Sequence, residues 1–537
     1  MSKEVNTVSS VARSARTVSL AVLGSRILGL VREQVLASLF GASREFDAFV
    51  TAFRIPNLLR DLFAEGALSA AFVTTFSQKL TSEGEQSAWR LANLVLNALL
   101  IALGAITLIG IIAAPWIVNV IAPGFQSIAG KTALTVQLTR IMFPFLLLIA
   151  VAALAMGMLN SKHRFGVPAS ASMMFNVGSI FGGVGLAFAL APNFLHNASQ
   201  MPRAMIGISV GTLIGGAMQW LIQVPSLRSV GYHYQPVLDW RDPGFRQVLR
   251  LVGPSIIGTA AVQINVFVDN WFASWPMMSG PAGNGAVSWL NCAFRLVQFP
   301  IGLFGVAIGV ATLPTASAHV ARGDIARFRT TLGHSIRLAF FLCVPAACGL
   351  AVLARPIVST IYEHGRFTAD ATTQTALCLQ AFAVGLAGYA AIKVIAPTFY
   401  ALGDSRTPMF VSIFSIIVNA ALDYLFAITM GMKTAGLALS TSFVALTNFF
   451  LLLMLMRRKI ERIEASVLLR SLVRIGIASL VMTGAAWYTH TKLADHRYLD
   501  VGVSIAVAWI VFGVACKLLR VEEFRELLDA LRLGKKV

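Results

Sequence analysis

The chain has 537 residues, of which 57% are hydrophobic and only 12% are charged, and its mean hydropathy is +0.74. Soluble domains carry about 25% charged residues, so this composition excludes an ordinary soluble protein and indicates a polytopic membrane protein. The formal net charge of +19 does not indicate a nucleic-acid partner, because most of the Lys and Arg residues fall on one side of the predicted membrane segments. That asymmetry predicts cytoplasmic N- and C-termini.

Long apolar runs predict an all-α fold with fourteen membrane-spanning helices. The first apolar run is interrupted by charge, which argues against a cleavable signal peptide. The approximate segments are 17–40, 46–78, 91–120, 133–159, 167–190, 204–227, 253–275, 286–318, 335–354, 374–401, 408–428, 434–456, 467–488 and 499–518.

The first segment carries Arg26, Arg32 and Glu33 inside an apolar run. A charge at the centre of a membrane helix costs roughly 2.5 to 3.5 kcal/mol on the most lenient insertion scale, so such residues face a partner or a water-filled cavity. Arg26 and Glu33 share a helix stripe, whereas Arg32 points about 100° away from Glu33. One carboxylate cannot neutralise two guanidiniums, which predicts a net positive site. The alternative is a buried ion-pair network that locks this helix to its neighbours.

The second segment adds Arg54, Arg60, Asp61 and Glu65, with Pro56 in its middle. Proline removes a backbone donor and is expected to kink the helix. Asp61 and Glu65 are four residues apart and repel each other unless a cation lies between them, which Arg26, Arg32 or Arg60 could supply. This pattern predicts a helix that bends as a polar chamber opens and closes. The alternative is a static kink.

The eighth segment places Arg295 among Ser288, Trp289, Asn291 and Gln298. A guanidinium pairs bidentately with phosphate, whereas lysine offers only a point charge. Arginines on several segments therefore predict a site for an anion that bears several oxygens.

An internal repeat of about six segments relates Ala52-Phe53-Arg54 to Ala293-Phe294-Arg295, and Pro168 to Pro408. An even number of segments gives both copies the same direction, which predicts two parallel six-helix lobes of the kind found in alternating-access transporters. The predicted domains are 1–228 and 229–460 for the two lobes, and 461–537 for two extra helices with a cytoplasmic tail.

The second lobe contains a candidate cation site. Asp269, Asn419, Asp423 and Thr441 lie within predicted segments and supply hard oxygen ligands suited to Na⁺, or to a proton relay. The alternative is hydrogen bonding between helices. Coupling to Na⁺ or H⁺ is the only cofactor-like requirement that we expect.

The remaining side chains give no indication of catalysis. The five cysteines lie in apolar segments without CxxC spacing, the eight histidines are scattered, and no Walker A motif is present, so neither a disulfide framework, a cysteine metal site nor ATP use is expected. The chain is therefore not expected to be an enzyme. The loop from Tyr362 to Phe367 faces the outer side, where it could gate the chamber, although a solvated loop is the expectation.

The charged segments closely resemble the N-terminal signature of the MurJ (MviN) family of the multidrug/oligosaccharidyl-lipid/polysaccharide exporter superfamily. The likeness is carried by Asp47-Ala48-Phe49 and Arg54-Ile55-Pro56-Asn57-Leu58-Leu59-Arg60, and it extends over essentially the whole chain. One departure is Phe294, where many relatives carry an acidic residue. The stretches that match are 25–32, 47–49, 54–60, 63–67, 294–300 and 403–408.

The resemblance implies a lipid II flippase of the bacterial inner membrane. Such a protein moves the undecaprenyl-pyrophosphate-linked peptidoglycan precursor to the periplasmic leaflet, driven by the membrane potential or a cation gradient. By position, Arg26, Arg32, Arg60 and Arg295 would hold the pyrophosphate, and Ser288 would line the cavity. The last two segments would hold the prenyl tail. Partners beyond lipid II and membrane lipids would be cell-wall synthesis and division proteins.

Two alternatives remain at this point. The first is another oligosaccharide-lipid flippase or a cation-coupled multidrug exporter of the same superfamily, although drug exporters favour acidic chambers and this one is net basic. The second is a membrane enzyme that acts on a prenyl phosphate, which would need paired histidines or an Asp-x-Asp motif at the membrane surface.

Overall fold

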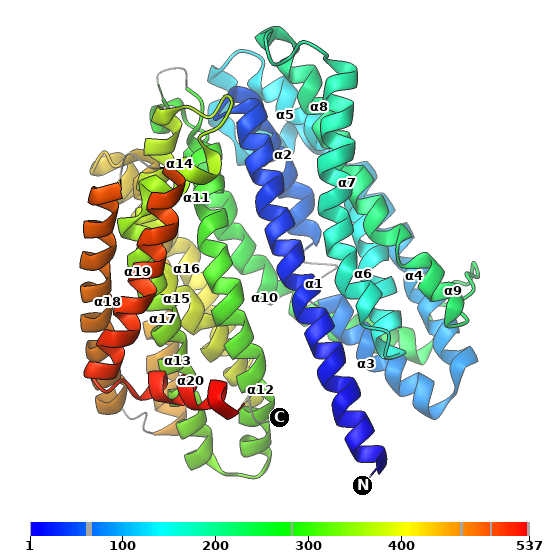
Figure 1. Ribbon diagram of the computed structural model, residues 1–537. Helices are drawn as coiled ribbons and strands as arrows, with labels where there is room; N and C mark the ends of the chain where they lie inside the picture. The colour runs from blue at the N-terminus through cyan, green and yellow to red at the C-terminus, as the bar shows by residue number, and fades with distance from the viewer. Residues whose placement is uncertain (1, 61–66, 281–282, 462–464, 494–496, 534–537) are drawn as a thin grey trace. The chain divides into compact units, whose positions relative to one another are not determined.

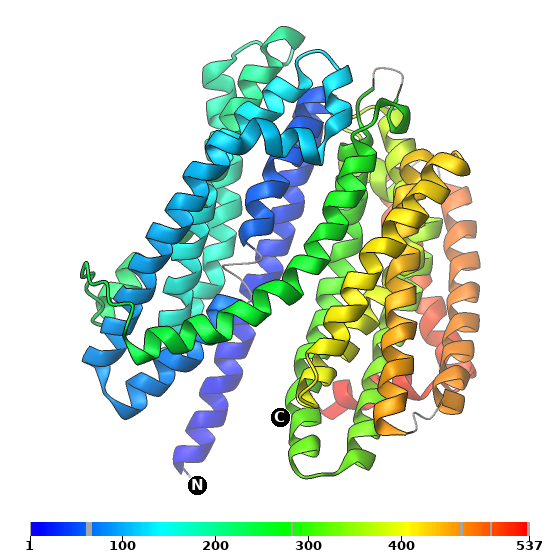
Figure 2. The ribbon, with the colours of Figure 1, turned by 180° about the vertical axis from the view of Figure 1, so that it is seen from behind.

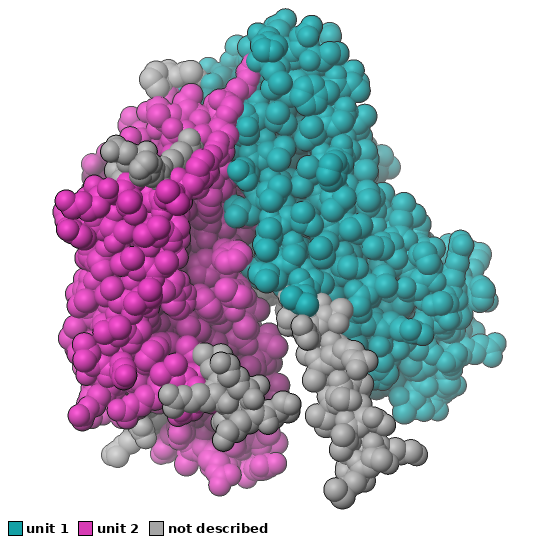
Figure 3. Space-filling view, in the orientation of Figure 1, with its two compact units in different colours: residues 1–276, 281–287 teal, residues 277–280, 288–537 magenta. Residues whose placement is uncertain are grey.

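The computed structural model describes residues 2–60, 67–280, 283–461, 465–493 and 497–533. Over these residues the chain forms helices and contains no β-strand (Figures 1 and 2), which confirms the predicted all-α class. The helices form two compact units (Figure 3): unit 1 comprises residues 1–276 and 281–287, and unit 2 comprises residues 277–280 and 288–537. This division reflects packing, whereas the predicted lobes reflect a sequence repeat, so the lobe boundaries at 228 and 460 stay a prediction.

Unit 1 contains the first ten α-helices, and three of them are short. Helices α3, α5 and α9 have 16, 12 and 6 residues and lie next to longer neighbours in the chain. The helices are α1 Ser2–Phe40, α2 Arg44–Arg60, α3 Ala67–Ser82, α4 Glu85–Ile121, α5 Lys131–Met142, α6 Phe145–Ser161, α7 Gly166–Leu190, α8 Met201–Leu221, α9 Val224–Ser229 and α10 Pro243–Ala273.

Unit 2 contains the remaining helices, with α11 starting at the boundary between the units. Two π-helical turns interrupt it, η5 Ile301–Gly305 after α11 and η6 Tyr424–Thr429 after α16. The helices are α11 Ala286–Pro300, α12 Val306–Ala321, α13 Ile325–Val352, α14 Ala354–Tyr362, α15 Ala369–Ala401, α16 Arg406–Asp423, α17 Lys433–Ile460, α18 Ala465–Leu493, α19 Arg497–Leu518 and α20 Glu522–Leu533.

Eleven helical stretches in the described part of the chain are long and apolar enough to cross a membrane. The other three predicted segments fall on α1, on α2 with α3, and on α10. The chain is therefore a multi-pass membrane protein, and the number fourteen stays a prediction.

Small residues bring α7 and α8 together in unit 1. A Cβ added to Gly211 of α8 would lie 2.2 Å from the Cα of Gly183 on α7. Only glycine permits this approach, and such small-residue contacts are how membrane helices pack where lipid offers no hydrophobic driving force.

Two buried amides on α4 fasten the loop that connects α9 to α10. The Asn93 side chain accepts a hydrogen bond from the Tyr232 hydroxyl at 2.8 Å, and the Asn97 side chain accepts one from the Tyr234 hydroxyl at 2.9 Å. Burial raises the pKa of Tyr232 to about 12, so this hydroxyl stays protonated and remains a donor. Helix α10 continues from this loop and packs against α3 and α4.

A buried ion pair in unit 2 attaches the C-terminal helix to the bundle. Arg337 of α13 lies 2.9 Å from Glu523 of α20, and Glu523 also accepts a hydrogen bond from Ser471 of α18 at 2.9 Å. Glu523 is 1% exposed. Helix α20 is thereby tied to two other helices of its unit through one carboxylate.

The loop between α15 and α16 is organised around Asp404. Its carboxylate accepts hydrogen bonds from the backbone of Arg406 at 3.1 Å and of Thr407 at 3.0 Å, and it pairs with Lys459 at the end of α17 at 2.9 Å. Burial alone would raise the pKa of the Asp404 carboxyl, but the hydrogen bonds from Thr407 and Lys459 outweigh it and lower that pKa well below its usual range.

We therefore expect Asp404→Asn to destabilise the protein in a pH-dependent manner. Because the folded-state pKa of the carboxyl is depressed, its contribution is present above the unfolded value near pH 4 and is lost as the pH falls further. The variant should unfold with about 1–2 kcal/mol less free energy at pH 7, and the difference should shrink below about pH 4. Thermal unfolding of the purified protein in detergent measures both.

The matched control is Glu461→Gln, which removes the 87% exposed partner of Arg329. Exposed pairs contribute little, so this variant should stay within about 0.5 kcal/mol of the parent. A loss for Asp404→Asn that does not change between pH 7 and pH 3 would contradict the assigned role of the charge.

Candidate functional site

One charge of α1, that of Arg32, lies against aromatic rings in unit 1. Arg32 contacts Glu33 at 3.4 Å, and its guanidinium lies 5.1 Å from the ring centre of Phe175 and 5.9 Å from that of Phe53. A cation is attracted to the face of an aromatic ring, so these rings stabilise Arg32 without neutralising it. The sequence reasoning had Arg32 pointing away from Glu33. The arginine side chain is long enough to reach back across the 100° that separates the two residues.

Arg26 lies two turns before Glu33 on the same helix and is half-buried. Its neighbour Ser25 accepts a hydrogen bond through its carbonyl from Asn176 of α7 at 3.1 Å. This bond fixes the middle of α1 on α7, so the backbone that carries Arg26 is held at this position.

Arg54 is held between α2 and α10. Its guanidinium donates to the side-chain oxygen of Asn270 at 3.1 Å and to the carbonyl of Val266 at 3.5 Å. Asn270 is fully buried, accepts from Thr51 at 3.3 Å and donates to the carbonyl of Ile121 at 3.3 Å. One asparagine thus joins α2, α4 and α10. It is a contact that the sequence analysis missed, because an amide in an apolar run gives no sign of its partner.

The second half of the charged segment is only partly described. Helix α2 continues through Pro56 and ends at Arg60, which is half-buried. Asp61 and Glu65 lie outside the described residues.

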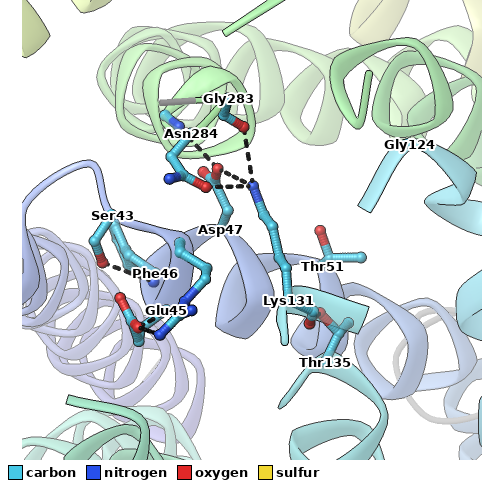
Figure 4. Close-up of polar contacts among 12 residues, drawn as sticks. Ser43, Glu45, Phe46, Asp47, Thr51, Gly124, Lys131, Thr135, Gly283 and Asn284 are labelled. Carbon is cyan, nitrogen blue, oxygen red and sulfur yellow. Dashed lines mark hydrogen bonds and ion pairs between the residues drawn. The ribbon is translucent and has the colours of Figure 1, made fainter. Parts of the chain in front are cut away.

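A fully buried ion pair lies at the start of α2. Lys131 of α5 contacts Asp47 at 2.8 Å, and each side chain is 1% exposed. The Lys131 ammonium also donates to the side chain of Asn284 at 3.1 Å (Figure 4). The backbone amide of Gly285 donates to Asp47 at 2.8 Å. The ring of Phe125 covers the ammonium at 4.2 Å. The residues just before α11, which belong to unit 1, are therefore fixed within it by a buried charge pair.

Lys131 was not among the predicted site residues. In the sequence it stands alone, just before an apolar run, as a charge on a membrane-flanking loop does. Its pairing with Asp47 across 84 residues leaves no trace in composition or spacing.

In unit 2, α11 carries a stripe of polar side chains. Ser288, Asn291, Arg295 and Gln298 follow one another at spacings of three or four residues, which places them on one helix face. Ser288 is fully buried, and Arg295 is half-buried with a contact of 3.4 Å to Gln298. Phe294, the departure from the family pattern, packs against Phe382 of α15 with ring centres 5.2 Å apart.

The candidate cation ligands divide between the units. Asn419 and Asp423 of α16 are fully buried, and the Asn419 amide donates to the Asp423 carboxylate at 3.1 Å. Ser440 of α17, which was not predicted, donates to the Asn419 carbonyl at 3.2 Å, whereas the Thr441 hydroxyl donates to its own helix. Asp269 belongs to α10 of unit 1, where it interacts electrostatically with Arg54.

The Lys131–Asp47 pair makes a strong stability prediction. Removing one partner leaves the other as an uncompensated buried charge, so Lys131→Met alone should destabilise the protein by about 3–5 kcal/mol. The double variant Lys131→Met with Asp47→Asn removes both charges and keeps an acceptor for Gly285, so it should recover most of the loss. Thermal unfolding of the purified chain measures both effects.

The control is Arg90→Met. Arg90 pairs with Asp239 at 3.3 Å, but these side chains are 56% and 38% exposed. We expect a loss below about 1 kcal/mol. A double variant less stable than Lys131→Met alone would contradict the assignment of the stability loss to the broken charge pair.

Comparison with known proteins gives a consistent result. Residues 36–507 match the family described as lipid II flippase MurJ. The chain is 35% identical to the lipid II flippase MurJ of Burkholderia cenocepacia over 476 residues, with 88% of this chain and 89% of that protein covered. It is 33% identical over 512 residues to a probable lipid II flippase MurJ of Vibrio cholerae, with 93% of each covered.

Solved structures agree with the sequence relatives. The chain superposes on an inward closed conformation of the lipid II flippase MurJ with a TM-score of 0.76 at 25% identity, covering 95% of this chain and 99% of that one. An inward-facing MATE multidrug transporter of the MOP superfamily shares the fold, with a TM-score of 0.67 at 15% identity and coverage of 81% and 94%.

These relatives are transporters, which confirms that the chain is not an enzyme and supports the expected place in the exporter superfamily. The match covers the charged helices α2 and α11 and the last five residues of α1, together with the helices that position them. The chain belongs to the lipid II flippase MurJ family.

Proposed function

We propose that this protein is a flippase that moves lipid II from the cytoplasmic to the periplasmic leaflet of the bacterial inner membrane, with both termini in the cytoplasm. The observation that carries the proposal is the family match over residues 36–507, together with relatives named lipid II flippase at 33–35% identity. The chemistry of the described residues supports it independently.

Transport of lipid II requires a pyrophosphate to cross roughly 30 Å of hydrocarbon, where its charges would lose their hydration. Guanidinium groups replace that hydration with charge-assisted hydrogen bonds, while the prenyl tail stays in lipid. Arg26, Arg32, Arg60 and Arg295 are the residues that we assign to this task. Each is partly exposed, as a residue that exchanges a protein contact for a substrate contact should be.

The remaining charged residues have other tasks in this proposal. Arg54 and its partner Asn270 hold α2 against α10. Arg54 therefore contributes positive electrostatic potential and fixes the position of α2. Glu33 limits the positive charge next to Arg32. Ser288 lines the substrate site on α11, and Asp61 and Glu65 continue the charged segment beyond Arg60.

Movement of the substrate proceeds by alternating access and is driven by the membrane potential or by a cation gradient. One elementary charge moved through 100 mV is worth about 2.3 kcal/mol, which is enough to bias a two-state equilibrium. Asp269, Asn419, Asp423 and Thr441 are the candidate groups for Na⁺ or H⁺ coupling. The buried pair of Asn419 and Asp423, followed directly by a π-helical turn, supports this assignment because such turns are frequent at functional sites.

A second candidate is a multidrug exporter or another oligosaccharide-lipid flippase of the same superfamily. It is favoured by the fold shared with a MATE multidrug transporter. Cationic drugs, however, would be repelled by a site with four arginines. An anionic lipid-linked substrate suits the charge of this chain better.

The test is translocation of lipid II in cells depleted of their own flippase, with the parent compared to Arg26→Ala, Arg60→Ala and Arg295→Ala at matched expression. A hydrogen bond to a charged group contributes about 1.5–3 kcal/mol, so each variant should lower the translocation rate about 10-fold to 100-fold. Arg90→Ala, which removes an exposed arginine, should transport like the parent.

Three results are informative. Rescue by the parent and failure of all three variants support the arginine site. A parent that moves no lipid II contradicts the substrate and favours another lipid-linked anion. Variants that transport at the parental rate contradict the pyrophosphate role of the arginines.

A further inference from the structure

The segment from Tyr362 to Phe367, at the end of α14, is not the solvated loop that its sequence suggests. Tyr362 is fully buried and Phe367 is 2% exposed. Their rings pack with centres 5.9 Å apart. The backbone turns back between them, with Gly365 in a left-handed conformation at φ +57° and the Phe367 amide bonded to the His364 carbonyl at 3.1 Å. The turn therefore serves to bury two aromatic side chains.

The Tyr362 hydroxyl contacts α11. It donates to the backbone carbonyl of Cys292 at 3.3 Å, within a fully buried environment. Cys292 lies three residues before Arg295, less than one helical turn away. A side chain of α14 is thus tied to the backbone of the helix that carries Arg295, close to that residue.

The rest of α11 packs against α15 on one side, and its C-terminal end is deformable. Phe294 packs against Phe382 and Tyr389 of α15, with ring centres 5.2 and 6.2 Å apart. The helix ends at Pro300 and passes into the π-helical turn Ile301–Gly305. Proline and a π-helical turn both weaken the regular hydrogen-bond ladder, so the helix is deformable at this end. Its orientation then depends on the contacts made nearer its start.

The position of Arg295 is sensitive to that orientation. Ser288, Asn291, Arg295 and Gln298 lie on one face of α11, and the Cys292 carbonyl that receives the tie is in the same part of the helix. A side chain about 6 Å from the helix axis moves about 2 Å when the helix turns by 20°. Displacements of this size are enough to spoil bidentate pairing with a phosphate.

We propose that Tyr362 is a positioning residue for Arg295: its hydroxyl fixes the rotation of α11 so that the guanidinium meets the pyrophosphate of the substrate. This inference rests on the proposed function, which assigns Arg295 to the pyrophosphate. Phe367 supports the tyrosine ring, and the turn at Gly365 lets both rings reach the interior.

The experiment is a double-mutant cycle on the full chain in detergent, with farnesyl pyrophosphate as the binding probe. Tyr362→Phe keeps the ring and removes only the hydroxyl, and it should weaken probe binding about threefold to tenfold. In the Arg295→Ala background the same change should alter binding less than twofold, because the hydroxyl acts through Arg295. Where alanine abolishes binding, Arg295→Lys serves as the second background.

The matched control is Tyr232→Phe, which removes another hydroxyl bonded to a protein acceptor, far along the chain from α11. It should leave probe binding unchanged. An equal loss for Tyr362→Phe in both arginine backgrounds would overturn the proposal, since the hydroxyl would then act independently of Arg295. No loss in the parent would overturn it as well.

A second readout does not depend on any substrate. Phe299→Cys introduces a thiol on the exposed side of α11, in a Cys348→Ser background because the other four cysteines are buried. Tyr362→Phe should change its rate of reaction with N-ethylmaleimide at least threefold, whereas Tyr232→Phe should not.

The two readouts separate this inference from the proposed function. If Tyr362→Phe leaves the rate of reaction with N-ethylmaleimide unchanged while lipid II transport still depends on Arg295, the positioning role of Tyr362 is rejected. The proposed function is then unaffected. A changed rate, with no effect of Arg295→Ala on binding or transport, rejects the role of Arg295 and therefore the positioning proposal, while α11 remains tied by Tyr362.

Discussion

Every charge that this chain carries into its apolar helices must be met by a partner, because an isolated charge in hydrocarbon costs several kcal/mol. The partners in the described residues include carboxylates, side-chain amides, backbone carbonyls and aromatic rings. Lys131 is met by Asp47, Arg54 by Asn270, and Arg32 by the ring of Phe175. Each solution joins different helices, so the buried charges decide which helices are held together as well as where a substrate could bind.

The kind of partner separates two roles. Lys131 and Arg337 lie 2.8 and 2.9 Å from carboxylates that are almost completely buried. These pairs are electrically neutral, and breaking them would strand a charge, so they suit a permanent attachment. Arg295, by contrast, contacts the neutral amide of Gln298 at 3.4 Å, near the limit of a hydrogen bond. A contact near this limit to an amide is weaker than the buried ion pairs of Lys131 and Arg337.

Much of the fold could be predicted from the sequence because it depends on local pattern. Apolar runs of sufficient length specify helices, and each predicted segment falls on a helix or on consecutive helices in the described residues. The cross-helix contacts could not be predicted in the same way. Asp47 and Lys131 are 84 residues apart, and Arg54 and Asn270 are 216 apart. Tyr362 and Phe367 were misjudged because Gly365 and charged neighbours mark a surface turn, while the aromatic rings on either side of the turn point inward.

A flippase has to hold a pyrophosphate firmly enough to take it out of water and loosely enough to release it on the other side. Contacts that are too strong would slow the release of the substrate. Binding also has to differ between the inward-open and outward-open states, because equal affinity for both shifts no population. In the proposed function the assigned arginines lie on separate helices, so the contact that each makes with the pyrophosphate depends on the orientation of its own helix. In α11 that orientation has a fixed point at the Cys292 carbonyl and a deformable point at the π-helical turn Ile301–Gly305. The hydrogen bond to Cys292 holds α11 close to Arg295, and the helix can bend at the π-helical turn. The segment after the turn can therefore move while the Arg295 guanidinium keeps its position.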